Sequence, residues 1–416
     1  MIAKQYIATI AFLLLIASNG FCQQKDLNYY INYAIQSSPL LKDFNNQISS
    51  TRIDSQLTRT KYVPQVNAVT NNVVAPVING YGYDQNISNT GAYSALVSAN
   101  KTFVGKKNLN AQLKTSGLQI DSLSNTATIS EQDLKKTVIA QFITAYGDQQ
   151  QLLNYTRIND ILSQEEIILK KLTTNNIYRQ TDYLTFLVTY KQQQLLLRQL
   201  QIQYQTDFAN LNYLCGILDT AANATTLADP DLQLLPLPDP SLSAFFDRYL
   251  IDSMLLQNNI ALTNLAYRPR LSVFGDAGYV SSFLLDGYKN FGFSAGFNIT
   301  VPIFDGHRRK LNITKTNLLE NTRLNYKDFF TAQYNQQIAT YIQQLHSTES
   351  LLTDIQEQVK YTEGLISVNK KLLETGDVKI SDFVIAINNY LTAQYLTTQN
   401  KISRFQIINQ INYYSR

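Results

Sequence analysis

The sequence predicts an α+β membrane protein in which very long helices alternate with pairs of β-strands, and in which this plan occurs twice. Three observations predict it. The residues from Phe291 to Val301 alternate in polarity like a strand, two long stretches lack proline, and the two halves of the chain match at a shift of about 200 residues.

The segment from Phe291 to Arg309 opens with the clearest strand. Successive side chains of a strand point to opposite faces. One face would carry Phe291, Phe293, Ala295, Phe297, Ile299 and Val301, and the other Gly292, Ser294, Gly296, Asn298 and Thr300. A strand of a soluble β-sandwich would also alternate. However, the polar face is small and uncharged, which suits the wall of a water-filled lumen, and the length matches the roughly 9–11 residues of a tilted membrane strand. We therefore expect Phe291, Phe293, Phe297 and Ile299 to face lipid, and Ser294, Asn298 and Thr300 to face a lumen.

Residues 1–22 have the pattern of a secretory signal peptide, with a basic start, an apolar run too short to span a membrane, and small residues before the cut. Lipidation of Cys22 is the alternative reading, but Phe21 stands where a lipoprotein signal needs a small residue. With cleavage after Cys22, Cys215 is the one remaining cysteine, so we expect no internal disulfide.

Composition excludes several classes of function. Lys plus Arg number 35 against 31 Asp plus Glu, with no basic stripe that would suit nucleic acid. The two histidines, His307 and His346, are far apart, and no group of residues has the spacing of a metal site or a catalytic motif. We expect no catalytic, cofactor or metal site. After the signal peptide no apolar run approaches the ~18 residues of a spanning helix, so entry into a membrane would require a β-barrel.

The first half of the mature chain, 23–228, is predicted to begin with a helical segment from Leu27 to about Leu57, whose pattern breaks at Ser37-Ser38-Pro39 and then resumes. Strands follow at about 63–77 and 92–104, the first of them beginning at Pro64. A proline-free helix then runs from Gly105 to about Leu172, on the order of 100 Å if continuous. The pattern lapses between Thr173 and Thr181, where Thr181 resembles a helix cap, and a further helix follows.

The linker 229–240 holds four of the nine prolines and divides the chain. The second half, 241–416, repeats the plan with a helix, strands at about 269–281 and 291–303, and a proline-free remainder. The helix before Pro269 is shorter than the helix before Pro64, so we expect one long helix to be short or to begin irregularly.

The two halves match residue by residue around the break. Lys170-Lys171-Leu172 reads against Lys370-Lys371-Leu372 at a shift of 200 (370 − 170), and the same shift carries Asp182 onto Asp382 without a gap. Repetition on this scale indicates an internal duplication.

Taken together, the layout resembles the TolC family of outer-membrane efflux channels, over essentially the whole mature chain. The motifs that carry the resemblance are the strand starts at Pro64 and Pro269, V-P-I-F-D-G at 301–306, and E-T-G-D-V-K-I-S-D at 374–382. The resemblance implies a homotrimer in which each protomer gives four strands to one twelve-stranded barrel in outer-membrane lipid. The long helices would then form a periplasmic tunnel.

The resemblance also implies roles for the helix turns. It assigns Asp182 and Asp382 to the periplasmic aperture, where a trimer makes rings of carboxylates that attract cations. The alternative for both residues is a favourable charge at a helix start and nothing more. Ile385 departs from the family pattern, since a second acidic residue can occur there. Asn175, Asn176, Thr375 and Gly376 are expected to dock a periplasmic adaptor.

The function expected from the sequence is a passive outer-membrane exit duct of a tripartite efflux or type I secretion system. It would work with a periplasmic adaptor and an inner-membrane pump, and it would not be an enzyme. An exported, soluble coiled-coil adhesin or chaperone is the first alternative. An exported enzyme with short strands around a cleft is the second, and the absence of a catalytic motif disfavours it. The residues do not identify the cargo or the class of pump.

Overall fold

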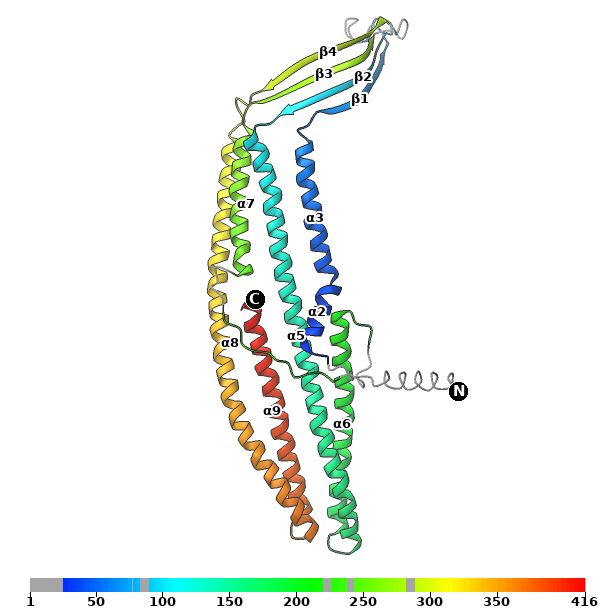
Figure 1. Ribbon diagram of the computed structural model, residues 1–416, viewed down its shortest axis with the longest axis vertical. Helices are drawn as coiled ribbons and strands as arrows, with labels where there is room; N and C mark the ends of the chain where they lie inside the picture. The colour runs from blue at the N-terminus through cyan, green and yellow to red at the C-terminus, as the bar shows by residue number, and fades with distance from the viewer. Residues whose placement is uncertain are drawn as a thin grey trace, which may run out of the picture. The chain divides into compact units, whose positions relative to one another are not determined.

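The computed structural model describes residues 25–76, 78–82, 90–219, 226–237, 243–281 and 289–415. Helices and strands follow one order twice along the chain: helix, two strands, a very long helix and a shorter helix (Figure 1). The first half comprises α2 (Leu27–Ser37), α3 (Pro39–Thr60), β1 (Gln65–Ala75), β2 (Thr90–Phe103), α5 (Lys106–Thr174) and α6 (Gln180–Cys215). The second half comprises α7 (Ala244–Ala266), β3 (Arg270–Ser281), β4 (Phe291–Thr300), α8 (Arg308–Thr375) and α9 (Ile380–Ser415). The expected signal peptide, with Cys22, and the end of the expected linker, 238–240, lie outside the described residues.

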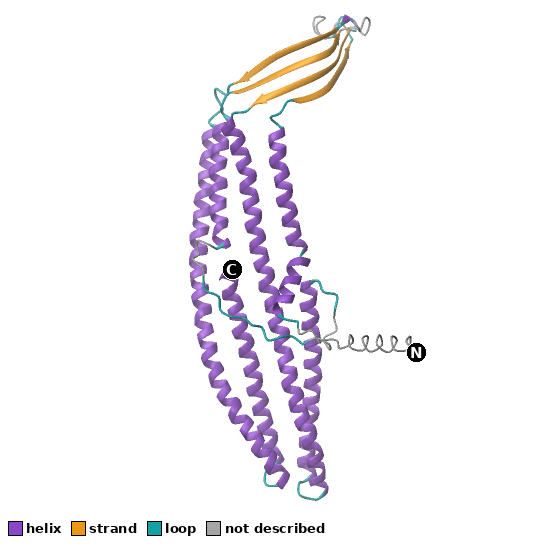
Figure 2. Cartoon of the chain, viewed as in Figure 1, coloured by secondary structure: helices purple, strands orange, loops and turns teal. Residues whose placement is uncertain are grey.

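The four strands form one antiparallel sheet in the order β1-β2-β3-β4 (Figure 2). Helix α3 leads into β1 and α7 leads into β3, while β2 leads into α5 and β4 into α8. Because neighbouring strands run in opposite directions, all four helix connections lie at one end of the sheet. β1 and β4 are its edges, and no further strand among the described residues pairs with their outer sides.

The described chain forms two compact units, and the division between them falls inside α3, α5 and α8. Unit 1 comprises the residues up to Lys42, Thr128–Ser243 and the residues from Thr331 onward. Unit 2 comprises Asp43–Ala127 and Ala244–Phe330, and it contains the sheet. The two longest helices, α5 with 69 residues and α8 with 68, each contribute to both units. Since isolated helices are marginal in water, they depend on packing against neighbours.

Unit 1 has two hydrophobic clusters. The first gathers around Tyr30, Phe142 and Phe208, which join α2, α5 and α6 and are fully buried. The second gathers around Phe186 and Phe383 beside the turns between long helices. Burying a side chain of this size stabilises the fold by roughly 1.5–3 kcal/mol. In α8, Ile338, Leu345, Leu352 and Ile355 lie on one side of the helix and are all buried.

Hydrogen bonds from polar side chains hold the described linker residues against the helices of unit 1. The Asn412 side chain of α9 donates a hydrogen bond of 2.8 Å to the carbonyl of Gln233 and accepts one of 2.9 Å from the backbone N–H of Leu235. The hydroxyl of Tyr146 donates to the Asp229 carboxylate at 3.1 Å. The two Asn412 bonds satisfy backbone groups that an extended, proline-rich segment leaves without partners, and the Tyr146 bond adds a contact between side chains.

In unit 2, helix α7 packs between α5 and α8. Asn258 donates hydrogen bonds to the carbonyl of Ala111 at 2.9 Å and to the hydroxyl of Thr115 at 2.8 Å. On the other side, the rings of Phe246 and Phe330 meet edge to face at 5.2 Å. Helices from both halves of the chain therefore support the sheet connections.

The start of α6 differs from the sequence-based expectation. The cap position is Arg179, and Thr181 lies inside the first turn instead of capping it. Arg179 makes no side-chain capping bond. A helix start without a Ser, Thr, Asp or Asn cap carries no local sequence signal, which is why Thr181 was the wrong choice.

The length difference between the halves has a simple structural cause. Helices α3 and α7 are nearly equal, with 22 and 23 residues, so neither is a shortened long helix. Instead, the 11-residue α2 has no counterpart before α7 in the described part of the chain. The expectation of one shortened long helix was therefore wrong. In the described residues, the second half has no counterpart of α2, which is a separate helix of about three turns.

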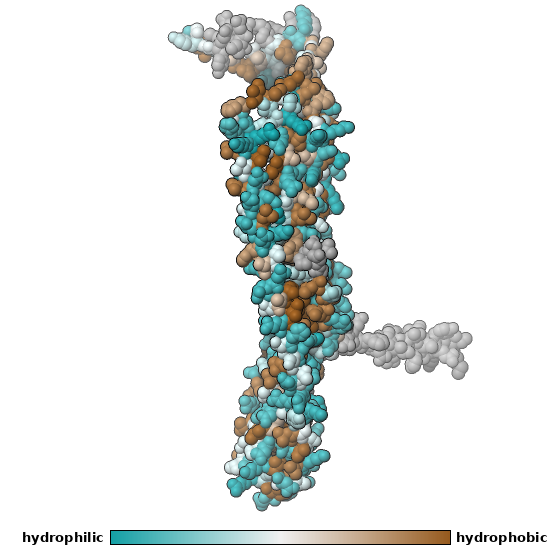
Figure 3. Space-filling view, turned by 90° about the vertical axis from the view of Figure 1, so that its left-hand side faces the viewer, coloured by the Kyte–Doolittle hydropathy of each residue, from teal (hydrophilic) through white to brown (hydrophobic). Residues whose placement is uncertain are grey.

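Within the described residues, no helix combines the length and the apolar character needed to cross a bilayer. Figure 3 shows hydrophobic and hydrophilic side chains intermixed over the helical surface, with hydrophobic ones exposed in many places.

Candidate functional site

The register of the sheet gives β4 one apolar and one polar face, although Leu96, Phe274 and Val280 of the neighbouring strands lie on the polar side. Phe297 pairs with Val273 and Phe293 with Ala277, whereas Ser294 pairs with Asp276 and Asn298 with Ser272. Directly paired residues in an antiparallel sheet lie on the same face. On β3 and β4 the apolar face therefore carries Leu271, Val273, Gly275, Ala277, Tyr279, Phe291, Phe293, Ala295, Phe297 and Ile299.

The apolar face continues across the other two strands. Ala277 pairs with Val97, and Val97 pairs in turn with Ala68. The residues that β2 and β1 add are Tyr93, Ala95, Val97, Ala99, Lys101, Phe103, Val66, Ala68, Thr70, Asn72 and Val74. Lys101 lies near the helix end of the sheet, with its ammonium 5.1 Å from the centre of the Phe103 ring. All four strands, two from each half of the chain, thus build one continuous face.

Among the described residues, no hydrophobic core packs against this face. Phe293 is 90% exposed, Phe297 71% and Phe291 70%, and Ile299 is exposed as well. Ser294, Asn298 and Thr300, on the opposite face, are also exposed. An apolar patch of this extent on a soluble monomer would be unusual, and patches of this kind mark contact with a protein or a membrane. The soluble-sandwich alternative for β4 requires a buried apolar face, which these exposures contradict.

In unit 1, the turns that join α5 to α6 and α8 to α9 have the same geometry. The N–H of Ile177 donates to the carbonyl of Leu172 at 3.0 Å, and the N–H of Asp377 donates to that of Leu372 at 2.9 Å. The residue before each donor is left-handed, with φ of 61° at Asn176 and 81° at Gly376. Each turn is therefore a Schellman motif, and Asn and Gly are the two residue types that tolerate its left-handed position.

The two turns also contact each other. The Tyr178 hydroxyl lies 3.1 Å from the carbonyl oxygen of Leu373 and 2.9 Å from that of Val378, and it donates to this pair. A Cβ at Gly376 would lie only 2.9 Å from a methyl carbon of Ile177. The predicted docking residues Asn175, Asn176, Thr375 and Gly376 are therefore together in space, with all but the partly covered Gly376 exposed.

The two predicted aperture residues occupy equivalent positions in the first turns of α6 and α9. The N–H of Asp182 donates to the carbonyl of Arg179 at 3.1 Å, and the N–H of Asp382 donates to that of Lys379 at 3.0 Å. Both carboxylates are exposed. This position favours an acidic residue electrostatically, so the geometry fits capping and an aperture equally.

The structure brings together two pairs of charged residues in unit 1 that no pattern in the sequence predicts. The Glu165 carboxylate is fully buried and lies 3.0 Å from the Lys370 ammonium. Asp148 faces Asp207, and burial together with a hydrogen bond to Asp207 raises the pKa of Asp148 to about 7. Each grouping joins positions that are distant in the chain, so only a structure reveals it.

The described residues hold no group of three or more His, Cys, Asp or Glu side chains that could bind a metal ion. His307 and His346 are both exposed. Cys215 is buried against α2, where its thiol lies 3.5 Å from the Tyr30 carbonyl oxygen, and burial raises the pKa of this thiol to about 12. A thiol that stays protonated is a poor nucleophile and metal ligand.

Comparison with solved structures identifies the fold of this chain. No protein-family model and no curated protein matches this sequence. Solved structures do match. The outer-membrane protein VceC of Vibrio cholerae is 14% identical with a TM-score of 0.73, covering 94% of this chain and 96% of that chain. The Campylobacter jejuni CmeC outer-membrane channel is 11% identical with a TM-score of 0.75, covering 94% of this chain and 85% of that chain.

The open state of the Neisseria gonorrhoeae MtrE outer-membrane channel is similar to the same degree. It is 12% identical with a TM-score of 0.75, and the match covers 93% of this chain and 88% of that chain. At these identities the likeness establishes the fold. The helices, the four-stranded sheet and the duplicated order of elements are thus those of the outer-membrane channels, and this chain has the fold of the TolC family.

Proposed function

We propose that this protein is an outer-membrane channel, in which three copies pool their sheets into one twelve-stranded barrel that serves as a passive exit duct. The observation that carries the proposal is the largely apolar face across β1 to β4, interrupted by Lys101, Thr70 and Asn72, with Phe293 90% exposed. Contact with lipid would remove this area from water, which is favourable by about 25 cal/mol per Å². Phe291, Phe293, Phe297 and Ile299 would then face lipid, and Ser294, Asn298 and Thr300 the lumen.

The free edges of the sheet supply the reason for a trimer. Four strands do not close a barrel, and an open edge in lipid leaves backbone groups unsatisfied at several kcal/mol each. Pairing β4 of one copy with β1 of the next removes every edge once the ring closes. Twelve antiparallel strands fit the even strand numbers of bacterial barrels.

Exposed stripes on the long helices support the same assembly. Leu184, Val188 and Leu195 of α6 recur at steps of four and seven, and each is more than half exposed. Tyr361, Leu365, Val368 and Leu372 of α8 form a second stripe with steps of four, three and four. Such spacing is typical of a coiled-coil seam, so each stripe would be covered by a helix of a neighbouring copy.

The remaining roles follow from the turns in unit 1. Asp182 and Asp382 would line the periplasmic aperture, and the exposed turn residues Asn175, Asn176, Thr375 and Gly376 would contact a periplasmic adaptor. That adaptor would connect the channel to an inner-membrane pump of an efflux or type I secretion system. In this arrangement the protein lies in the outer membrane with a periplasmic helical extension, and it carries cargo without chemistry.

Planar-bilayer recording tests both the channel and its aperture. Protein extracted from outer membranes in a non-ionic detergent should give single-channel conductance that divalent cations block from the periplasmic side. Asp382→Ala removes three carboxylates from a trimer and should weaken this block. Asp354→Ala is the matched control, because Asp354 is an exposed carboxylate on a different helix, α8, outside the turns. A preparation without conductance would refute the channel, and an unchanged block in Asp382→Ala would remove this residue from the aperture.

A further inference from the structure

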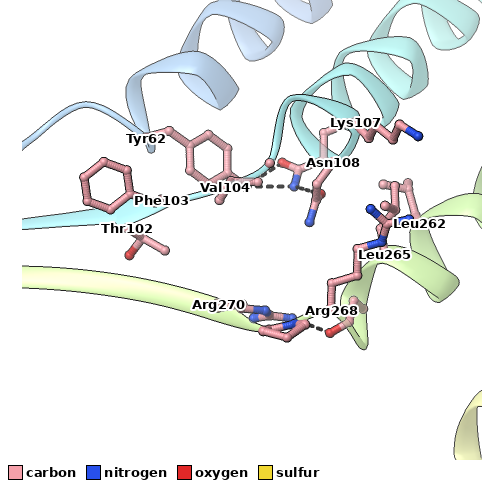
Figure 4. Close-up of a pocket in the computed structure, with 14 residues that line it drawn as sticks. Tyr62, Thr102, Phe103, Val104, Lys107, Asn108, Leu262, Leu265, Arg268 and Arg270 are labelled. Atoms are coloured by element: carbon pink, nitrogen blue, oxygen red, sulfur yellow. Dashed lines mark hydrogen bonds between the residues drawn. The ribbon is translucent and has the colours of Figure 1, made fainter. Parts of the chain in front are cut away.

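A pocket of about 320 Å³ lies in unit 2, at the helix end of the sheet between β2 and β3 (Figure 4). Its walls come from the end of β2, the start of α5, the end of α7 and the start of β3. The volume lies at the lower end of the range for small-molecule sites. Neither the aperture nor the turns contribute to it, so the proposed function leaves the pocket without a role.

The charged side chains of the pocket are all basic. Arg268 and Arg270 flank Pro269 on the α7–β3 side, and Lys107 comes from the opposite side (Figure 4). One nitrogen of the Arg270 guanidinium donates to the Ala266 carbonyl at 3.0 Å, which fixes the position of this side chain. No acidic residue lines the pocket, and no ion pair joins either arginine to a carboxylate in the described part of the chain.

The carboxylate of Asp305, which bonds to Tyr267 next to Arg268, is already engaged elsewhere. Asp305 accepts a hydrogen bond of 2.8 Å from the backbone N–H of Arg309. This bond, together with one from Tyr267, holds the pKa of Asp305 below its ordinary value. Asp305 is therefore an anion with its own partners, and it does not neutralise the arginines of the pocket.

The rest of the lining combines apolar and neutral polar groups. Leu262 and Leu265 of α7 are partly buried and form one apolar wall, and Phe103 adds an aromatic ring. On the α5 side, the Gln112 amide donates to the Tyr62 hydroxyl and to the Asn108 side chain, both at 2.8 Å. This bonded trio leaves the pocket with fixed polar groups next to an apolar surface.

We propose that this pocket binds an amphiphilic anion, with a phosphate or carboxylate group on Arg268 and Arg270 and an apolar body against Leu262, Leu265 and Phe103. The planar guanidinium is suited to two parallel hydrogen bonds to such an oxyanion. Phe103 also belongs to the apolar face of the sheet, so the pocket lies at the end of that face. If the face contacts lipid, as proposed above, the pocket lies at headgroup level, and a phospholipid headgroup or an anionic cargo molecule supplies the anion.

Fluorescence titration can measure this binding directly, because the chain contains no tryptophan. Phe103→Trp places a single indole in the pocket of the full-length, detergent-solubilised protein. Three probes are titrated: short-chain phosphatidylglycerol, short-chain phosphatidylcholine and inorganic phosphate. We expect a saturable change with phosphatidylglycerol and at least about tenfold weaker binding of phosphatidylcholine, since tenfold corresponds to about 1.4 kcal/mol.

Charge-removing variants in the same Phe103→Trp background identify the groups that bind the anion. Arg268→Gln and Arg270→Gln keep polar side chains of similar length and should each weaken phosphatidylglycerol binding at least about tenfold. Arg198→Gln removes one charge from the exposed face of α6 in unit 1 and should leave binding unchanged. Circular dichroism establishes that each variant is folded before the titration.

Each outcome has a definite meaning. Saturation with inorganic phosphate but not with phosphatidylglycerol would identify a free oxyanion as the ligand and overturn the amphiphilic ligand proposed here, whereas a response to phosphatidylglycerol without one to phosphate would identify the lipid. Equal affinity for phosphatidylcholine, no saturable response to any anion, or arginine variants that bind like Arg198→Gln would overturn the proposal. The oligomeric mass of the same sample shows separately whether the proposed trimer forms, so the two proposals fail independently.

Discussion

The hydroxyl of Tyr178 lies 2.9 Å from the carbonyl oxygen of Val378, and the two residues are 200 positions apart. That separation is the shift that relates the two halves of the chain, so a residue in one turn bonds to its own counterpart in the other turn. The duplication therefore also has a consequence for contacts within the chain. It brings equivalent turns of a single chain into contact, and the tyrosine in only one of them makes the contact asymmetric.

We predict that Tyr178→Phe loosens the two turns from each other without unfolding the helices. The variant removes a half-buried hydroxyl that donates to backbone carbonyls, a change that costs about 1 kcal/mol. Hydrogen–deuterium exchange should become faster in residues 172–183 and 372–383 and stay unchanged near Tyr30. Tyr361→Phe is the control, since the Tyr361 hydroxyl bonds only within its own helix, to Glu357 at 2.9 Å. Equal exchange in both variants would show that the Tyr178 contact does not hold the turns.

Because the Glu165 carboxylate is buried, we predict that substitutions of Glu165 and Lys370 change the free energy of unfolding in a strongly non-additive way. Lys370→Met leaves Glu165 without its ion partner and should destabilise the protein by about 3 kcal/mol, the lower end for an unpaired buried charge, because Lys370 is one-third exposed. Adding Glu165→Leu removes the charge and should recover most of that loss. Chemical denaturation of the two single variants and the double variant, each compared with the wild type, gives the free energies of unfolding for a double-mutant cycle. Additive effects would mean that the two side chains do not interact.

Asp148 and Asp207 predict a dependence of stability on pH. Burial and a hydrogen bond to Asp207 raise the pKa of Asp148 to about 7 from an ordinary value of 3.8. A raised pKa means that the folded protein holds this proton more tightly than the unfolded chain. The resulting stability is fully present below about pH 4 and is lost as the pH rises through about 7.

Asp207 shifts in the opposite direction. Burial alone would raise the pKa of Asp207, but hydrogen bonds from Asp148, Gln141 and Gln203 bring it below its ordinary value. Its contribution is therefore present above about pH 4 and is lost only in more acidic solution. Between pH 5 and 8, the contribution of Asp148 to stability therefore changes with pH, whereas that of Asp207 stays constant.

Asp148→Asn should therefore flatten the pH profile. The amide can still donate to Asp207, but it carries no charge at any pH. We expect the Tm of the wild type to fall more than that of Asp148→Asn between pH 5 and pH 8. Asp160→Asn, at an exposed position on the same helix, should follow the wild type. Parallel wild-type and Asp148→Asn profiles would mean that Asp148 does not hold a proton at neutral pH.

The two faces of β4 predict opposite responses to a charge. Phe293→Arg puts a cation on the apolar face, which costs about 2–4 kcal/mol at the middle of a membrane barrel. Ser294→Arg puts the same cation next to it on the polar face and should cost little. The yield of folded protein in liposomes, read as resistance to protease, compares the two. Equal yields would contradict the assignment of lipid and lumen to these faces.

The sequence predicts the strands and the turns well because their signals are local. The alternation from Phe291 onward has a period of two and needs no knowledge of other segments. The turns carry left-handed residues at Asn176 and Gly376, and the shift of 200 matches the two turns position by position.

Other features depend on contacts between distant segments. Glu165 lies in a polar stretch, and its burial follows from Lys370 on another helix. The pocket is built by residues as far apart as Tyr62 and Arg270. Where a local signal was absent, as at the uncapped Arg179, the sequence-based boundary was wrong by about two residues. What each face of the sheet contacts is a property of the assembly, so the sequence and a single chain leave it as a proposal.

The central claim is that two hairpins from each copy form a barrel only when three copies combine. The most direct test is the mass of the particle extracted from outer membranes, measured by native mass spectrometry after release from the detergent micelle. The account predicts a particle of three mature chains that is lost from solution when detergent is removed. A single chain that stays soluble and folded without detergent would contradict it.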